Sequence, residues 1–259
     1  MGKMIENKYI IKKKSKGMTL IEVLFSTAIF SFVAITLFAL FKLGQTYWSK
    51  GIAYNTLQAE GKRILTLLQQ DIKESDINRD RDYIKYRNYP GAVGEVSNIL
   101  VGSQNVNRDG LLLSVPNPKY SGRAGEYPVI YRAYIATSEK NDNQGGTGSL
   151  YLLEFKPTSA TGYDQTWSDI NSDISNLFSQ DGFSKGDLDR IRLNNPRLSK
   201  VSLLSNNLFS FRANINSNTN TIGISVVLMR KSFSDQKLQS VRFELEIAPA
   251  NNDQFPFNN

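Results

Sequence analysis

The sequence predicts an α+β protein in which a long N-terminal helix, partly membrane-spanning and partly amphipathic, packs on an antiparallel β-sheet. Two observations support this fold class. An uncharged apolar run from Val23 to Phe41 passes directly into residues with amphipathic helical spacing. After Asp76 the composition becomes polar and rich in turn residues, with short apolar runs that are typical of strands. One β-rich domain attached to a long helix is compatible with 259 residues.

The composition excludes most familiar catalytic designs. The chain contains no cysteine and no histidine, which removes disulfides, Cys or His metal ligands, and nucleophile systems that depend on histidine. Carboxylate pairs and a Ser-Lys dyad remain, but no motif places such groups together. We therefore expect neither an enzyme nor a cofactor.

Residues 1–17 are predicted to be a basic leader. They hold six lysines against Glu6 and so carry +5 of the net charge of +7, which leaves about +2 for the rest of the chain. A net charge of this size is too small to argue for nucleic-acid binding. The lysines are Lys3, Lys8, Lys12, Lys13, Lys14 and Lys16. Lysines before an apolar span stay cytoplasmic, so we expect everything after the span on the far side of the membrane.

The run from Val23 to Phe41 is predicted to cross a membrane. Its helical length would be roughly 28 Å, about one hydrocarbon core. The polar members of the run are Ser26, Thr27, Ser31 and Thr36. A signal peptide would have a shorter apolar region followed by a small-residue cleavage site, and no such site follows in residues 42–50. The span is therefore expected to remain in the mature protein.

Glu22 does not fit a plain membrane anchor, because it lies at the start of the apolar run. A carboxylate costs up to a few kcal/mol at the centre of a bilayer and less near its interface, so Glu22 is expected to have a partner. The residues around it read Lys16-Gly17-Met18-Thr19-Leu20-Ile21-Glu22.

This segment resembles the prepilin peptidase site of type IV pilins and type II secretion pseudopilins. The resemblance implies cleavage after Gly17, N-methylation of Met18 and an assembly role for Glu22, the fifth residue counted from Met18. We expect no metal site. The resemblance also implies other pilin or pseudopilin subunits, a prepilin peptidase, an inner-membrane assembly platform and membrane lipid as partners.

A physical argument explains the spacing without the family. Cleavage creates an ammonium at Met18, and methylation keeps its charge. Two charges among apolar helices are tolerated only when paired, so the ammonium of one subunit and Glu22 of its neighbour would fix one axial register. The alternative is an ordinary signal anchor whose Glu22 reaches to the interface, which leaves Gly17 and the register unexplained.

Residues 44–75 are predicted to continue the membrane helix, residues 18–43, as an amphipathic helix. The apolar positions recur at three- and four-residue steps: Leu57, Gly61, Ile64, Leu68 and Ile72. The whole helix, from Met18 to about Glu74, would be roughly 85 Å long, with Gly44, Gly51 and Gly61 as weak points. Tyr47 and Trp48 are expected either in an interfacial aromatic belt or as the first core residues of the head, residues 76–259.

Six strands are predicted in the head: Leu111 to Val115, Val129 to Ile135, Leu150 to Phe155, Leu208 to Ile215, Ile222 to Met229 and Val241 to Ile247. Alternation in the fourth and the sixth of these strands predicts one sheet face against the helix and the other facing water. The alternating apolar residues include Phe209, Phe211, Ala213 and Ile215. Residues 156–200 are expected to be mostly loop, with one short surface helix around Ile170, Ile174, Leu177 and Phe178.

The arrangement resembles pilin architecture over the whole chain. Residues 67–75 and 203–211 also resemble J-type minor pseudopilins. The expected function is a minor pilin or pseudopilin that assembles through its N-terminal helix into a type IV pilus-like or type II secretion filament, at or near its tip because the head is large. The expected location is a single pass in the inner (cytoplasmic) membrane, with the leader cytoplasmic and the head outside, followed by an extracytoplasmic filament.

Two other interpretations rest on smaller motifs. Asp76, Asn78, Asp80 and Asp82 alternate like the first ligands of an EF-hand loop, but Arg81 and Arg87 replace its required glycine and glutamate, so a solvated helix end is favoured. A DNA-capturing minor pilin is the alternative function. It would use basic pairs with nearby tyrosines, although surface ion pairs are favoured for them: Lys62 and Arg63, Arg79 and Arg81, Arg190 and Arg192, Arg230 and Lys231, with Tyr83, Tyr86 and Tyr89.

Overall fold

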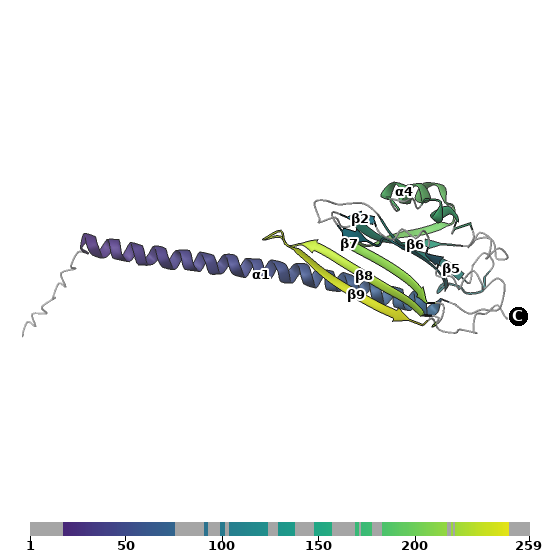
Figure 1. Ribbon diagram of the computed structural model, residues 1–259, viewed down its shortest axis with the longest axis horizontal. Helices are drawn as coiled ribbons and strands as arrows, with labels where there is room; N and C mark the ends of the chain where they lie inside the picture. Colours follow the sequence, from purple (N-terminus) through teal and green to yellow (C-terminus); the bar gives the residue numbers. More distant parts are fainter. Residues whose placement is uncertain are drawn as a thin grey trace, which may run out of the picture. The chain divides into compact units, whose positions relative to one another are not determined.

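A long helix and a seven-stranded antiparallel sheet dominate the chain (Figure 1). The chain divides into two compact units, residues 1–48 and residues 49–259. The computed structural model describes residues 18–75, 91–92, 99–101, 104–123, 129–137, 148–156, 169–170, 172–177, 183–216, 219 and 221–248.

Helix α1 runs from Leu20 to Glu74, which confirms the predicted helix. It contains Gly44, Gly51 and Gly61 without interruption, although glycine costs up to about 1 kcal/mol relative to alanine within a helix. No proline occurs in the helix, and proline is the residue that would break it most strongly. The helical hydrogen bonds therefore continue through all three glycines.

The main sheet has the order β1-β4-β5-β6-β7-β8-β9, and every neighbouring pair is antiparallel. Its strands are β1 (Gly91–Ala92), β4 (Gly110–Pro116), β5 (Val129–Ala136), β6 (Gly148–Phe155), β7 (Leu198–Asn216), β8 (Thr221–Lys231) and β9 (Leu238–Ile247). All six predicted strands are confirmed. Three features were not predicted: β1, the first half of β7, and a separate hairpin of β2 (Ile99–Val101) and β3 (Gln104–Val106).

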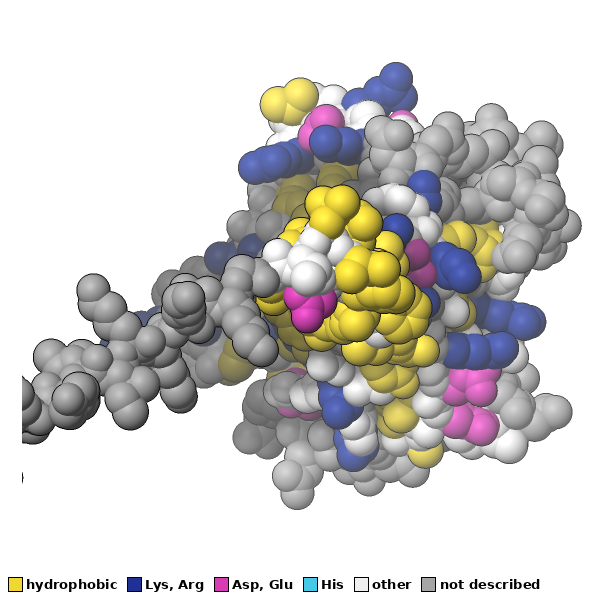
Figure 2. Space-filling view, turned by 90° about the vertical axis from the view of Figure 1, so that its left-hand side faces the viewer, with side chains coloured by type: hydrophobic (Ala, Val, Ile, Leu, Met, Phe, Trp, Pro, Cys, Tyr) yellow, Lys and Arg dark blue, Asp and Glu magenta, His cyan; other side chains and the backbone are white. Residues whose placement is uncertain are grey.

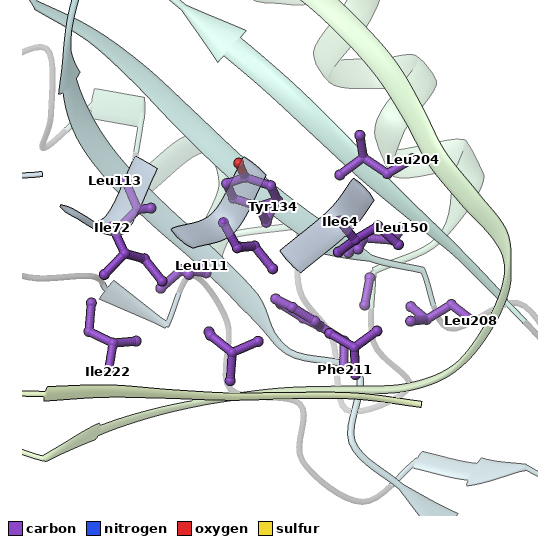
Figure 3. Packing of buried hydrophobic residues seen from close by; sticks show 14 of the residues in the cluster. Ile64, Ile72, Leu111, Leu113, Tyr134, Leu150, Leu204, Leu208, Phe211 and Ile222 are labelled. Atoms are coloured by element: carbon purple, nitrogen blue, oxygen red, sulfur yellow. The ribbon is translucent and has the colours of Figure 1, made fainter. Parts of the chain in front are cut away.

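The predicted apolar stripe of α1 packs on one face of this sheet. Its five residues are all buried, together with Ala53 and Asp71. Figure 3 shows Ile64 and Ile72 among side chains from the strands, including Tyr134 and Phe211. Each buried aliphatic side chain contributes roughly 1.5–3 kcal/mol, so this interface is a principal source of stability. The amphipathic spacing therefore identified the helix face that carries the core.

The opposite face of β4, β5 and β6 is also buried, which corrects the expectation that it faces water. A second apolar cluster covers it, formed by strand residues such as Tyr131 and Phe155 together with residues from helical segments: Ile170, Ile174, Leu188 and Ile191. The expectation does hold for β9, where Arg242, Glu244 and Glu246 are exposed and the intervening apolar residues pack toward α1. Among the described residues, the sheet is thus covered on both faces in the half formed by β4, β5 and β6.

Helix α4 (Lys185–Asn194) lies in the segment that was expected to be mostly loop. Ser184 caps it: the Ser184 side chain accepts a bond from the Asp187 backbone N–H, and the Asp187 carboxylate accepts one from the Ser184 N–H. This capping box offsets the polar composition of the helix. The predicted short surface helix is found: residues 169–170 and 172–175 are helical, with Ile170 and Ile174 buried in the second cluster and Ser172 and Asp173 exposed.

A β-bulge in β7 corrects the predicted face of Phe209. The pairing of β7 with β8 shifts between Leu208 and Ser210, and Leu208 and Phe211 are both buried in the main core. An inserted residue reverses the alternation on either side of it, so Phe209 does not join the core as strict alternation predicted. Ala213 keeps its predicted place against the core.

Candidate functional site

Thr19 and Glu22 close the N-terminus of α1 by a reciprocal pair of hydrogen bonds. Glu22 Oε2 accepts from the Thr19 backbone N–H at 2.8 Å and from Thr19 Oγ1 at 2.9 Å. The Glu22 backbone N–H donates to Thr19 Oγ1 at 3.4 Å, and the Val23 N–H donates to the Thr19 carbonyl at 3.2 Å. This is a capping box, which satisfies backbone donors that every helix N-terminus leaves open. The Glu22 carboxylate therefore has a partner within its own chain.

The first part of α1 presents an apolar surface all round. Figure 2 shows hydrophobic side chains gathered over this end of the helix. A stretch of α1 has a mean hydropathy of 2.4, is long enough to cross a membrane, and has no residue buried within the protein. Tyr47 is 67% exposed and Trp48 is 70% exposed, so neither is a core residue. Of the two expectations for these aromatic residues, a place in an interfacial aromatic belt remains.

The hydroxyl groups within the apolar run bond to the helix itself. Thr27 Oγ1 donates to the Leu24 carbonyl at 2.9 Å, Ser31 Oγ to the Thr27 carbonyl at 2.7 Å, and Thr36 Oγ1 to the Phe32 carbonyl at 2.9 Å. Back-bonding of this kind removes the need for water or a partner at each hydroxyl. These three polar side chains thus cost little in a hydrocarbon environment.

A buried charged group joins α1 to strand β5. Asp71 is 1% exposed; its Oδ1 accepts from Arg132 Nη1 at 2.5 Å and its Oδ2 from the Tyr134 hydroxyl at 2.5 Å. Glu154 of β6 lies 3.6 Å from Arg132 Nε. Burial raises the pKa of Asp71 above its usual value, against the opposing effect of Tyr134 and Arg132. Burial also raises the pKa of Tyr134 well above its usual value, with the Asp71 charge adding to the effect.

Glu60 makes a second polar connection, between α1 and strand β7. Its carboxylate accepts from Ser205 Oγ at 2.8 Å and from Asn207 Nδ2 at 3.0 Å. Ser205 and Asn207 are nearly fully buried. Charge-assisted bonds of this kind fix the helix against the sheet in rotation and in translation. Neither Glu60 nor Asp71 was predicted to have a role, because both lie among the polar positions of an amphipathic helix.

The predicted site residues fall at one end of the chain. Gly17 lies outside the described residues. Met18 is 71% exposed and directly precedes the capping pair. Glu22 was predicted as a site residue but Thr19 was not, although the Thr-x-x-Glu spacing is itself the signature of a capping box.

The fold and this site define a protein with a pilin-like arrangement of a long helix on an antiparallel sheet, in which the N-terminal part of the helix is long and apolar enough to cross a membrane. Residues 12–38 match the family model of the prokaryotic N-terminal methylation motif, which is the type IV prepilin-like signal. The match supports the prepilin-like family and covers the whole of the predicted cleavage segment. No curated protein and no solved structure matches the chain.

The described residues give little support to the calcium and DNA interpretations of the smaller motifs. The acidic residues of the calcium hypothesis lie outside the described residues, and so do Arg79, Arg81 and the three tyrosines. In the part of the chain that is described, no group of three or more acidic side chains is arranged to hold a metal ion. Of the basic pairs, Arg190 lies 3.7 Å from Asp187, and the Arg230 guanidinium lies 5.3 Å from the ring centre of Phe233.

Proposed function

We propose that this chain is a minor pilin or pseudopilin, a structural subunit that assembles through α1 into a type IV pilus-like or type II secretion filament. The observation that carries the proposal is Glu22, fixed at the start of a fully exposed apolar helix and within the matched methylation motif. The pilin-like fold supports the same conclusion. The function needs no catalytic group of the chain's own.

The proposed layout follows from the motif. Residues 1–17 are the leader that a prepilin peptidase removes, residues 18–43 are the membrane and assembly helix, residues 44–75 continue it, and residues 76–259 form the head. The leader would lie in the cytoplasm and the head outside the inner membrane, because the basic residues precede the span. An inner-membrane assembly platform would then move the subunit into the filament.

Glu22 and Met18 would set the register between neighbours. In the single chain, Thr19 supplies two donors to the Glu22 carboxylate. In the filament, the N-terminal ammonium of an adjacent subunit's Met18 would replace or join them. A charged pair in an apolar setting forms at only one axial offset, since any other offset leaves both charges without partners. Before assembly, the hydrogen bonds of the capping box lower the cost of placing the Glu22 carboxylate in the membrane.

A low-copy position at or near the filament tip is proposed from the size of the head. A major subunit repeats along the fibre and must pack laterally on every side, whereas a terminal subunit has fewer neighbours. The test is abundance: purified filaments should contain this chain as a minor component. Finding it as the principal component would contradict the tip position without affecting the assembly proposal.

Analysis of the N-terminus tests the processing step. Protein recovered from its native host should have an intact mass and an N-terminal sequence that begin at Met18, with the methylated amine. A matched Gly17→Val variant should keep the uncut mass, because cleavage follows this glycine in the resembling family. A mature chain that begins at any other residue would remove the basis of the proposal.

A further inference from the structure

The turn between β8 and β9, residues 232–237, is held against the beginning of the second compact unit. The backbone N–H groups of Phe233 and Ser234 donate to Ser49 Oγ at 2.9 and 3.2 Å. Asp235 lies 2.9 Å from Lys50 Nζ and also accepts from the Ser232 hydroxyl. These contacts fix the turn beside the segment of chain that leads out of the apolar run.

The turn presents an exposed aromatic ring between basic side chains. Phe233 is 68% exposed, whereas Phe243, the aromatic residue of β9, packs against the core. The Arg230 guanidinium stacks over its ring at 5.3 Å, and Lys231 follows Arg230 in the strand. Within the described part of the chain, neither Arg230 nor Lys231 has a carboxylate at ion-pair distance.

A cavity of about 300 Å³ lies beside the ring, lined by both basic residues and by Asn206 and Asn207. The acidic residues nearby already have partners. Glu60 accepts from Ser205 and Asn207, and Asp235 accepts from Lys50. The hydrogen bonds from Ser232 and Lys50 hold the pKa of Asp235 below its usual range, so this carboxylate keeps its charge and its partners. The two basic groups at the cavity therefore remain available for an anion.

We propose that the β8–β9 turn docks on the membrane that α1 crosses, with the Phe233 ring in the headgroup layer and with Arg230 and Lys231 on the phosphates of anionic phospholipids. An exposed aromatic ring flanked by basic groups is the combination that favours a membrane–water interface. The inference goes beyond the assembly proposal and depends only on anchoring by the apolar run. It describes the subunit before assembly, while its anchor is still in lipid.

The short connection between the turn and the apolar run favours lipid as the binding partner of the turn. Ser49, which the turn contacts, follows Phe41 at the end of the uncharged run by eight residues. Eight helical residues rise about 12 Å, and the headgroup layer of one leaflet is roughly 5–8 Å thick. The side chains of Phe233 and Arg230 can cover the difference. The turn is thus tethered within reach of headgroups whenever the apolar run spans a bilayer.

Fluorescence quenching in nanodiscs tests the proposal on the full chain. The chain has no cysteine, so Ser234→Cys gives a single labelling site for a polarity-sensitive dye and keeps Phe233 intact. The matched control is Leu193→Cys on α4, a residue that is 84% exposed. The quencher is a spin-labelled phospholipid, in discs of phosphatidylcholine alone or mixed with phosphatidylglycerol. The assay uses unprocessed chain, so its result is independent of cleavage and assembly.

The dye at position 234 should be quenched more than the dye at position 193, and more strongly when phosphatidylglycerol is present. Arg230→Gln and Lys231→Gln should each lower the docked-to-undocked ratio about fivefold, as expected for one basic residue near an anionic surface. Phe233→Ser should lower it in both lipid mixtures. Near-ultraviolet circular dichroism of each variant checks that the fold is unchanged.

Three outcomes would overturn the proposal. Equal quenching at positions 234 and 193 would place the turn away from lipid. Quenching that is the same with and without phosphatidylglycerol, and the same in the two glutamine variants as in the parent chain, would contradict binding to anionic headgroups. A dye at position 234 that responds to short duplex DNA and not to lipid would assign the basic pair to nucleic acid instead.

Discussion

The ring of Phe243 in β9 occupies the space that a side chain on Gly61 of α1 would need. A Cβ atom at Gly61 would lie 2.6 Å from Phe243 Cδ2 and closer still to Cε2 and Cζ. The sequence analysis treated Gly61 as a weak point of the helix, but here glycine lets a strand approach the helix backbone. Gly51, in contrast, faces open space.

Substitution of these two glycines by alanine should therefore have opposite effects. Gly51→Ala should raise the free energy of unfolding by about 0.5–1 kcal/mol, because alanine is the better helix former. Gly61→Ala gains the same propensity but overpacks against Phe243, which costs about 1–3 kcal/mol, so a net loss is expected. Chemical denaturation of the full chain in detergent measures both. If Phe243→Leu does not restore part of the loss in Gly61→Ala, the clash is not its cause.

Asp71→Ala should destabilise the protein by about 3–5 kcal/mol, because it leaves the half-buried Arg132 without its main partner. The matched control is Glu244→Ala, which removes an ion pair with Arg242 whose side chains are 67% and 63% exposed. Exposed pairs contribute about 0–1 kcal/mol, so the control should change little. Equal losses in the two variants would mean that burial does not decide the strength of these pairs.

Tyr134 should make the protein less stable at alkaline pH. Its folded pKa is raised, so above pH 10 the unfolded chain loses the tyrosine proton while the folded chain keeps it. The free energy of unfolding then falls by up to about 1.4 kcal/mol per pH unit from this group. Tyr134→Phe lacks the titration, so its stability deficit at pH 8 should shrink as the pH rises toward 11. A deficit that is constant across this range would contradict the raised pKa.

Glu22→Gln should separate assembly from helix capping. Glutamine also serves at this position of a capping box, so insertion and cleavage should continue, but the neighbour's ammonium loses its counter-charge. Such a defect costs about 3–5 kcal/mol where the site is dry. Crosslinking to pilin-like partners should therefore fall steeply, with normal processing shown by intact mass.

Thr19→Val is the matched variant for this experiment. It removes the capping hydroxyl, which contributes about 1 kcal/mol to the helix end, and it keeps the Glu22 charge. Crosslinking should be largely preserved. If Thr19→Val abolishes crosslinking while Glu22→Gln does not, then capping matters more than charge pairing, and the register role of Glu22 is wrong.

The sequence predicted the parts of the fold that depend on periodicity. The five-residue stripe of α1 and six strands follow from repeating apolar positions, which depend on backbone geometry alone. Phe209 shows the limit of this reasoning, because a bulge reverses the alternation between the residues before it and the residues after it, and no local pattern marked it. Ile170 and Ile174 show a second limit, because the sequence of a short helix does not indicate which surface of the protein the helix will cover.

The candidate site was predictable where its residues are neighbours in sequence. Gly17, Met18 and Glu22 form a local motif, whereas Asp71 meets Arg132 and Tyr134 about sixty residues away. Arg108 is a similar case: it is fully buried, donates to the Thr137 carbonyl at 2.9 Å, and burial lowers its pKa to about 10. Its sequence neighbours are polar, so nothing near it indicates that a buried cation is required.

The polar connections that Glu60 and Asp71 make between α1 and the sheet determine how the head bears a mechanical load. Glu60 and Asp71 are eleven residues apart on one helix and bond to different strands, β7 and β5. A pull along the helix axis would shear both connections at once, together with the apolar stripe between them. Bonds loaded in shear must break together, whereas bonds loaded by peeling break one after another. Tension applied through α1 would therefore meet its greatest resistance at this interface, and the helix would slide from the sheet only after both carboxylates had released their donors.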